Sequence, residues 1–121
     1  MTTHFITNIE KKTLQNKNYR KVVHTDTYQQ IVLMSLNVGE YIHCEKHSGT
    51  QFFRIEHGTG LAVVGNKKLQ LADGIALSVL PNICHKIINT SKKEPLKIYT
   101  IYSPPQHKPN EICKRQPKED K

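Results

Sequence analysis

The sequence has no apolar run long enough to cross a bilayer. Its longest aliphatic stretches, at residues 31–34 and 61–64, are far shorter than the roughly 20 residues that a membrane-spanning helix needs. The N-terminus also lacks the basic, apolar and small-residue order of a secretory signal. We therefore expect a soluble protein that has no membrane partner and stays in the cytoplasm.

Cysteine is scarce. The three cysteines, Cys44, Cys84 and Cys113, cannot all pair within one chain, and their spacing matches neither a Cys-x-x-Cys zinc site nor a disulfide framework. We therefore expect reduced thiols. Cys44 and Cys84 each stand next to a polar residue that we expect to point inward, so the two cysteines should point to the opposite face. We interpret them as small buried hydrophobic side chains.

Acidic residues are too few to balance the basic ones, and the net charge of +8 raises the question of nucleic-acid binding. The excess lies mainly at the ends, since residues 1–24 carry about +4 and residues 104–121 about +2, which leaves about +2 for the middle. No Arg-rich groove or known reader motif accompanies this charge. We interpret the terminal lysines as solvated charges and do not expect nucleic-acid binding.

Length and residue pattern indicate a single all-β domain. A chain of 121 residues suffices for one hydrophobic core, and it contains no internal repeat. Runs rich in Val, Ile, Thr, Tyr and Phe alternate with Gly, Asn and Asp about every 8 to 12 residues, which is typical of a sandwich or barrel. No helix is indicated. The expected strands are 21–25, 29–36, 41–46, 50–56, 60–64, 67–71, 75–80, 85–89 and 96–102.

Both ends of the chain lie outside this pattern. We expect an N-terminal extension at residues 1–18, a barrel at residues 19–103 and a C-terminal tail at residues 104–121. Pro104 and Pro105 cannot continue a central strand because proline lacks the ladder donor, so the tail is either draped over the barrel or disordered. Open barrel edges and the apolar run at residues 98–102 favour a homodimer.

Three potential metal ligands occupy alternate positions in one expected strand. His43, Glu45 and His47 leave the same face of an extended chain. Gln51 and His85 open two later strands and offer further donors. Two imidazoles and one carboxylate suit divalent Fe, Mn, Ni, Co or Zn and leave positions open to a substrate. The pattern predicts a divalent metal centre that includes Glu45, His47 and His85.

These residues also fall into two motifs. Cupins share a first motif, Gly-x5-His-x-His-x3-4-Glu-x6-Gly, and a second, Gly-x5-Pro-x-Gly-x2-His-x3-Asn. The spacing of both is kept here by Gly39, Glu45, His47, Gln51 and Gly58, and by Gly74, Leu80, Asn82, His85 and Asn89. The chain thus resembles the cupin superfamily, in particular its small single-domain members, over residues 28–107. The resemblance implies a double-stranded β-helix, or jelly-roll barrel, around a cavity.

Four positions depart from the cupin motifs. Glu45 stands where the first His is usual, and Gln51 stands where the Glu is usual. Leu80 replaces the Pro, with Pro81 one place later, and Asn82 replaces the Gly. The resemblance therefore carries over the fold more strongly than the usual ligand set.

Carried over position by position, the resemblance implies a metal set of Glu45, His47, Gln51 and His85. Gln51 either ligates the metal or forms a hydrogen bond with a bound water or with Glu45. His43 either binds the ion, supports its ligands or is a polar residue at the barrel mouth, and Asn89 would support the ligands.

The other candidate residues have weaker patterns. We interpret the remaining histidines as surface residues: His4, His24, His57 and His107. Tyr99 or Tyr102 could donate a proton, and the parity of the strand at residues 96–102 leaves both open.

In function, the resemblance implies a metal-binding cupin that acts on or binds a small polar molecule, such as a sugar derivative or an oxo acid. Its chemistry would be isomerase-like or dioxygenase-like. The sequence leaves open whether the protein is an enzyme. The alternative is a non-catalytic small-molecule-binding or sensor cupin without metal.

Overall fold

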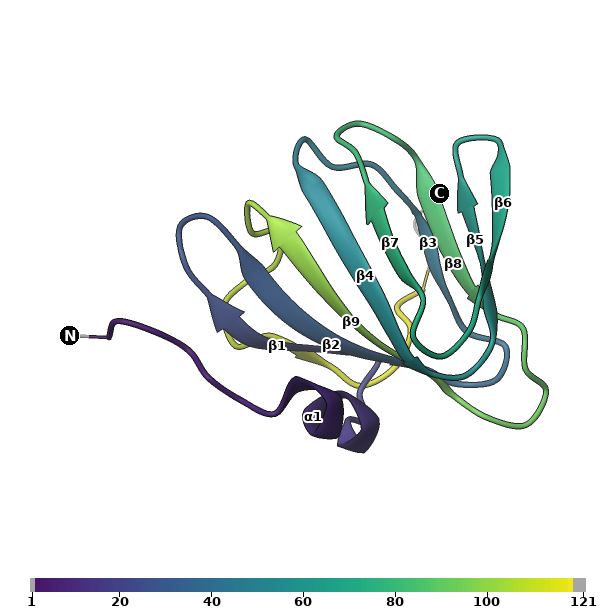
Figure 1. Cartoon of the computed structure of the whole chain (residues 1–121), viewed down its shortest axis with the longest axis horizontal. Coiled ribbons are helices and arrows are strands. Elements are labelled where there is room, and N and C mark those ends of the chain that lie inside the picture. Colours follow the sequence, from purple (N-terminus) through teal and green to yellow (C-terminus); the bar gives the residue numbers. More distant parts are fainter. Residues whose placement is uncertain (1, 119–121) are drawn as a thin grey trace.

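Two antiparallel sheets face each other in the computed structural model, which describes residues 2–118 (Figure 1). The larger sheet has the strand order β10-β1-β2-β9-β4-β7, and the smaller sheet has the order β3-β8-β5-β6. The elements are α1 (Ile9–Gln15), β1 (Arg20–Thr25), β2 (Gln30–Leu36), β3 (Tyr41–Glu45), β4 (Thr50–His57), β5 (Gly60–Val64), β6 (Lys67–Leu71), β7 (Ala76–Val79), β8 (His85–Asn89), β9 (Leu96–Ser103) and β10 (Ile112–Cys113). The all-β jelly-roll fold expected from the sequence is confirmed, and each expected strand is present within one residue of its bounds.

The core lies between the two sheets. Val32, Phe53 and Ile98 face inward from the larger sheet, and Ala62 and Ile87 face them from the smaller one. Their positions follow the period of two that an extended strand imposes on its side chains. Burying each large side chain stabilises the fold by about 1.5–3 kcal/mol. This apolar layer packs the two sheets against each other.

Two motif glycines form turns that lead into strands. Gly39 has φ +87° before β3, and Gly74 has φ +86° before β7. In this left-handed region a side chain is strained, although a Cβ at either position would meet no atom within 4 Å. The backbone conformation, rather than close packing, explains why glycine stands at these two positions.

Helix α1 was not expected, and the prediction that the chain has no helix is wrong. The side chain of Asn8 caps it by accepting a hydrogen bond of 3.0 Å from the backbone N–H of Lys11. Thr13 is its one buried residue, so no apolar periodicity marked the segment. Lys97, from β9, donates to the backbone oxygen of Asn16 just after the helix. Within residues 2–118, no helix has the length and apolar character needed to span a membrane.

The C-terminal segment through residue 118 lies over the barrel, as one of the two expected alternatives. Strand β10 pairs with β1, with Arg20 opposite Cys113. The amide of Gln30 binds the same segment on both sides: it donates to the backbone oxygen of His107 at 2.7 Å and accepts from its N–H at 3.0 Å. The segment is therefore held by backbone pairing at one point and by a buried side chain at another.

Strand β9 is the centre of the larger sheet, because it pairs with β2 on one side and with β4 on the other. Its apolar run therefore gives no free edge, and that part of the argument for a homodimer is wrong. The homodimer itself stays a prediction. The outward side chains of β9, Tyr99 and Ile101, are partly buried beside the N-terminal segment. In that segment Ile6 is 84% exposed.

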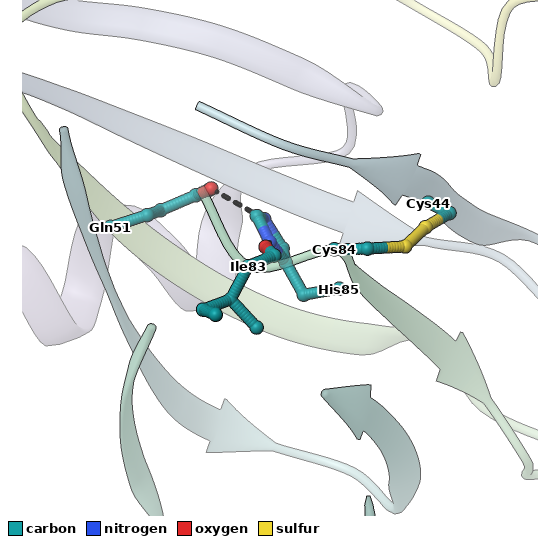
Figure 2. Close-up of a disulfide and its surroundings, with 5 residues drawn as sticks. All are labelled: Cys44, Gln51, Ile83, Cys84 and His85. Carbon is teal, nitrogen blue, oxygen red and sulfur yellow. Dashed lines mark hydrogen bonds between the residues drawn. A yellow bond between two sulfur atoms is a disulfide. The ribbon is translucent and has the colours of Figure 1, made fainter. Parts of the chain in front are cut away.

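A disulfide joins Cys44 at the end of β3 to Cys84 just before β8, with their Cα atoms 5.7 Å apart (Figure 2). The expectation of reduced, buried thiols is wrong for both residues, since Cys44 is exposed and Cys84 is half-buried. The thiol of Cys113 is free. Pairing could not be predicted from the sequence because the cysteines are 40 residues apart and meet only through the β3–β8 register.

Replacing Leu96, which is fully buried, tests the core. Leu96→Ala is expected to lower the free energy of unfolding by about 2–5 kcal/mol, because it removes apolar contacts and leaves a cavity. Denaturant unfolding followed by circular dichroism measures the loss. The matched variant Leu69→Ala, at an exposed position, should cost less than about 1 kcal/mol. Equal losses in the two variants would contradict this description of the core.

The disulfide makes a second prediction. Reduction with dithiothreitol, or the substitution Cys84→Ser, is expected to lower the free energy of unfolding by about 2–4 kcal/mol, because the crosslink restricts the unfolded chain. The same denaturant experiment measures it. Cys113→Ser serves as the control and should leave the response to dithiothreitol unchanged. An equally stable reduced protein would show that the crosslink contributes nothing.

Candidate functional site

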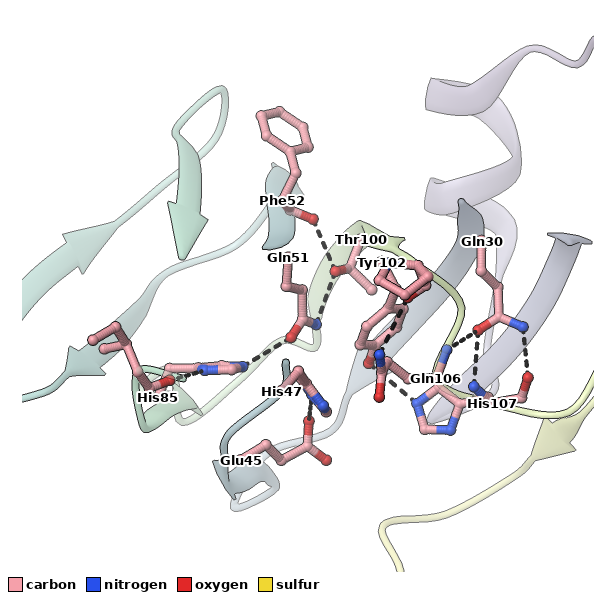
Figure 3. A network of polar contacts seen from close by, with 12 residues as sticks. Gln30, Glu45, His47, Gln51, Phe52, His85, Thr100, Tyr102, Gln106 and His107 are labelled. Atoms are coloured by element: carbon pink, nitrogen blue, oxygen red, sulfur yellow. Dashed lines mark hydrogen bonds and ion pairs between the residues drawn. The ribbon is translucent and has the colours of Figure 1, made fainter. Parts of the chain in front are cut away.

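Three of the predicted ligands meet at one end of the barrel. Strands β3 and β8 pair so that Glu45 lies opposite His85, and His47 follows two residues later in the β3–β4 connection. One donor atom from each of the three residues lies within 4.8 Å of the other two. Figure 3 shows these side chains converging between the two sheets. We call Glu45, His47 and His85 the polar cluster.

A break in the β3 register explains which residues join the cluster. The pairing of β3 with β8 shifts between Ile42 and Glu45, so strict alternation is lost there. His43 is exposed and lies outside the cluster, although the sequence predicted a common face with Glu45 and His47. A local irregularity of this kind has no signature in the residue pattern.

Glu45 and His47 form the first close pair of donors. Glu45 Oε1 lies 3.2 Å from His47 Nε2. Burial raises the pKa of Glu45, but the hydrogen bond with His47 and the fields of nearby histidines outweigh it, so the pKa falls below its ordinary value. Glu45 is therefore a carboxylate near neutral pH.

His85 and Gln51 form the second pair and link the two sheets. His85 Nε2 lies 2.8 Å from Gln51 Oε1, and His85 Nδ1 lies 2.9 Å from the backbone oxygen of Ile83. Both side chains are about 1% exposed. Burial is the main reason why the pKa of His85 falls below its ordinary value, so the ring is neutral near pH 7.

The amide of Gln51 is fixed by a hydrogen-bond chain within the larger sheet. Gln51 Nε2 donates to Thr100 Oγ1 at 3.0 Å, and Thr100 Oγ1 donates to the backbone oxygen of Phe52 at 2.8 Å. Because the Thr100 proton is used, its oxygen accepts from the Gln51 amide, and Gln51 Oε1 must face His85. Both ring nitrogens of His85 thus face oxygen acceptors, while a neutral imidazole can donate to only one of them.

This donor set fits a divalent metal ion. With the His85 proton on Nδ1, bonded to Ile83, the lone pair of Nε2 and the oxygen of Gln51 both face the cluster, which favours a cation beside them. The donor separations of 2.8 and 3.2 Å are close to the roughly 3 Å between neighbouring ligands of an ion with bonds of about 2.1 Å. Two imidazoles, a carboxylate and an amide oxygen suit first-row transition metals.

The substitution of Asn82 for the motif glycine is accommodated in the backbone. Asn82 has φ +65°, a left-handed conformation that Asn adopts more readily than most residues. Its N–H donates to the backbone oxygen of His47 at 2.7 Å. The loop before His85 is thereby tied to the loop that carries another cluster residue.

Tyr102 and His107 lie beside the cluster. The ring of Tyr102 packs edge-on against His47 with centroids 5.4 Å apart, and its hydroxyl lies 3.2 Å from His107 Nε2. Burial raises the pKa of Tyr102 far above its ordinary value, so the phenol keeps its proton. Of the two candidate proton donors, Tyr102 is the inward one and Tyr99 faces outward. The interpretation of His107 as a surface residue is wrong, because the tail folds it back over the barrel mouth.

The remaining candidates lie elsewhere. Asn89 is at the far end of β8, about 13 Å along the strand from His85, and donates to the backbone oxygens of Leu36 and Glu94. It holds the β8–β9 turn and does not support the cluster. His57 binds Glu94 at 2.9 Å near that same turn. His4 is exposed, whereas His24 is partly buried and stacks on Phe5.

Acid should destabilise the metal-free protein. The folded-state pKa of His85 lies below 6.5, so stability is complete above that pH and falls as the unfolded chain takes up the proton. The pKa of His107 is also lowered, so its protonation on unfolding reduces stability in acid as well. The lowered pKa of Glu45 affects stability only below about pH 4.5. The raised pKa of His57 in its ion pair with Glu94 changes stability weakly in the opposite direction. Between pH 7.5 and 5.5 the free energy of unfolding should fall by at most about 1.4 kcal/mol per pH unit for each proton taken up.

Denaturant titrations across this pH range measure the effect. In His85→Gln the slope with pH should be smaller than in the parent protein, while His4→Gln should leave it unchanged. An unchanged slope in His85→Gln would show that His85 does not cause the loss.

Comparison with known proteins identifies the family of the chain. Residues 32–102 match the cupin domain family. The chain is 42% identical over 117 residues to the uncharacterized protein L612 of Acanthamoeba polyphaga mimivirus, an alignment that covers 93% of this chain and 73% of L612. It is 40% identical over 110 residues to the uncharacterized protein YrkC of Bacillus subtilis, covering 85% of this chain and 59% of YrkC. The chain thus spans less than two thirds of the length of YrkC.

A solved structure gives the same result. The crystal structure of BH2720 from Bacillus halodurans is similar to this chain with a TM-score of 0.90 and 34% sequence identity. The match covers 93% of this chain and 90% of BH2720. With the family match, the close relatives and the shared fold taken together, the chain belongs to the cupin family.

Proposed function

We propose that the protein binds one divalent metal ion through Glu45, His47 and His85, with Gln51 Oε1 as a fourth ligand. The arrangement around His85 carries this proposal. Its Nε2 and the Gln51 oxygen are buried, point to the same space and cannot both be satisfied by a neutral ring whose proton is bonded to Ile83. A cation shared by the two atoms resolves the conflict. Divalent Fe, Mn, Ni, Co and Zn all suit this set.

In this proposal a small polar molecule, such as a sugar derivative or an oxo acid, binds at the ion within the barrel. A bound divalent ion would supply Lewis-acid polarisation or oxygen activation, as in isomerase-like and dioxygenase-like cupins. The chain's own residues orient the molecule. The Tyr102 hydroxyl, protonated at neutral pH, can donate a hydrogen bond at the cluster, and His107 holds that hydroxyl in place. The apolar ring of Phe53, 5.8 Å from the His85 ring, limits access of water from the core side.

One observation favours a second candidate, a non-catalytic cupin that binds a small molecule without metal. The donors of the cluster also pair with each other, since Glu45 bonds His47 and Gln51 bonds His85. A protonated Nε2 would satisfy Gln51 and leave Nδ1 as the unprotonated atom near Ile83. Such a cavity would act as a sensor, and a ligand would raise its thermal stability without turnover.

Metal content decides between the two candidates. Untagged protein purified without chelators should carry close to one equivalent of a first-row metal by plasma mass spectrometry. His47→Ala and His85→Ala should each lose it, because two of the four ligands are imidazoles. Gln51→Glu should keep the metal or bind it more tightly, since it replaces a weak neutral ligand by a carboxylate.

His57→Ala is the matched control, because it removes a histidine from the far end of β4. Its metal content should equal that of the parent protein. Metal that persists in the His47 and His85 variants would contradict the proposed site. Protein without metal under all conditions would favour the sensor.

A further inference from the structure

A cavity of about 220 Å³ adjoins the polar cluster at the mouth of the barrel. Its wall combines one member of the cluster with residues from β1 and from the C-terminal segment. The lining residues are Tyr19, Arg20, His43, Glu45, Gln116, Pro117 and Lys118. The cavity is below the usual size of drug-sized pockets, so a molecule of only a few heavy atoms fits it.

The guanidinium of Arg20 is largely unused by the protein. Its side chain is 13% exposed, and Nη1 donates to Glu111 Oε2 at 2.9 Å. Nε is buried and has no hydrogen-bond partner among the described residues, and no hydrogen bond from Nη2 is found there either. An arginine offers five donors in a planar fork that matches a carboxylate. A partly buried cation with spare donors beside a ligand-sized cavity indicates recognition of an anion.

The other charges around the cavity have both signs, since Lys118 favours an anion and the Glu45 carboxylate repels one. Lys118 lies on its wall. Burial lowers the pKa of His107, and the nearby charge of Arg20 lowers it further. Tyr19 packs its ring 5.5 Å from the guanidinium carbon and keeps Arg20 in place. Glu45 belongs both to this cavity and to the polar cluster, so the two are contiguous.

We propose that this cavity binds a small organic carboxylate, with its carboxylate group on Arg20 and its other end toward Glu45, His47 and His85. The inference narrows the substrate class of the proposed function from any small polar molecule to small acids such as oxo acids and short dicarboxylates. The contact between the ligand and the metal rests on that proposed function. The contact between its carboxylate and Arg20 does not depend on the metal.

Glu111 competes with such a ligand. Its carboxylate occupies one side of the guanidinium and repels a second carboxylate. Removing this charge should therefore improve ligand binding, although it breaks the same ion pair that an Arg20 substitution breaks. A purely structural role of the pair predicts the same change in both variants. Ligand binding predicts opposite changes.

Malonate titration of the full-length protein tests the proposal. The amide ¹H–¹⁵N spectrum and the Arg20 Nε–H resonance report binding. Malonamide, which has the same shape without charge, is the control ligand. The parent protein should bind malonate and not malonamide. Arg20→Gln should weaken malonate binding about tenfold or more, and Glu111→Gln should strengthen it.

Lys118→Gln gives a second test that does not depend on the fold, because Lys118 is exposed. It should weaken malonate binding about two- to threefold by removing a surface charge. Lys21→Gln, on the outer face of the same strand as Arg20, should have no effect. Equal weakening in Arg20→Gln and Glu111→Gln, or equal binding of malonate and malonamide, would overturn the proposal.

Performing the titration on metal-free and on metal-loaded protein separates this proposal from the proposed function. Malonate binding that requires Arg20 in the metal-free protein supports the carboxylate site, even where the metal content shows that the cluster holds no ion. Malonate binding that requires His47 but not Arg20 overturns the carboxylate site and leaves the metal site standing.

Discussion

The hydrogen bond between Gln51 and His85 connects the two sheets at the open end of the barrel, where the apolar core gives way to polar residues. Gln51 is held from the side of the larger sheet by Thr100, and His85 from the side of the smaller sheet by Ile83. With the His85 proton on Nδ1, the same close approach leaves two acceptor atoms facing the space that the proposed ion would occupy. The contact fixes the direction of the imidazole, while the β3–β8 pairing brings His85 opposite Glu45.

The strands could be predicted because their signal is local. Alternation of apolar and polar residues, broken by glycine and asparagine, marks each strand within a few residues of its ends. The cluster could be predicted because its members stand at alternate or motif positions, as Glu45 and His47 do. His43 could not be excluded in advance, because a single shift in the β3–β8 register decides where it points.

The features that the sequence did not reveal all depend on contacts between distant segments. Helix α1 forms on a capping residue and on packing against the sheet, with one buried side chain of its own. His107 and Arg20 come together only because residues 104–118 return along β1. A histidine that follows two prolines, as His107 does, gives no local indication that the chain folds back over the barrel.

The crosslink between Cys44 and Cys84 stands one residue away from two of the proposed ligands, Glu45 and His85, in the two strands that carry them. Reduction of this disulfide would free the two strands that carry Glu45 and His85 from their crosslink. Linkage is reciprocal, so any factor by which the oxidised chain binds the ion more tightly is also the factor by which the ion protects the crosslink from reductants. The redox potential of the surroundings and the concentration of the metal would then jointly set the fraction of the protein that is crosslinked and metal-bound.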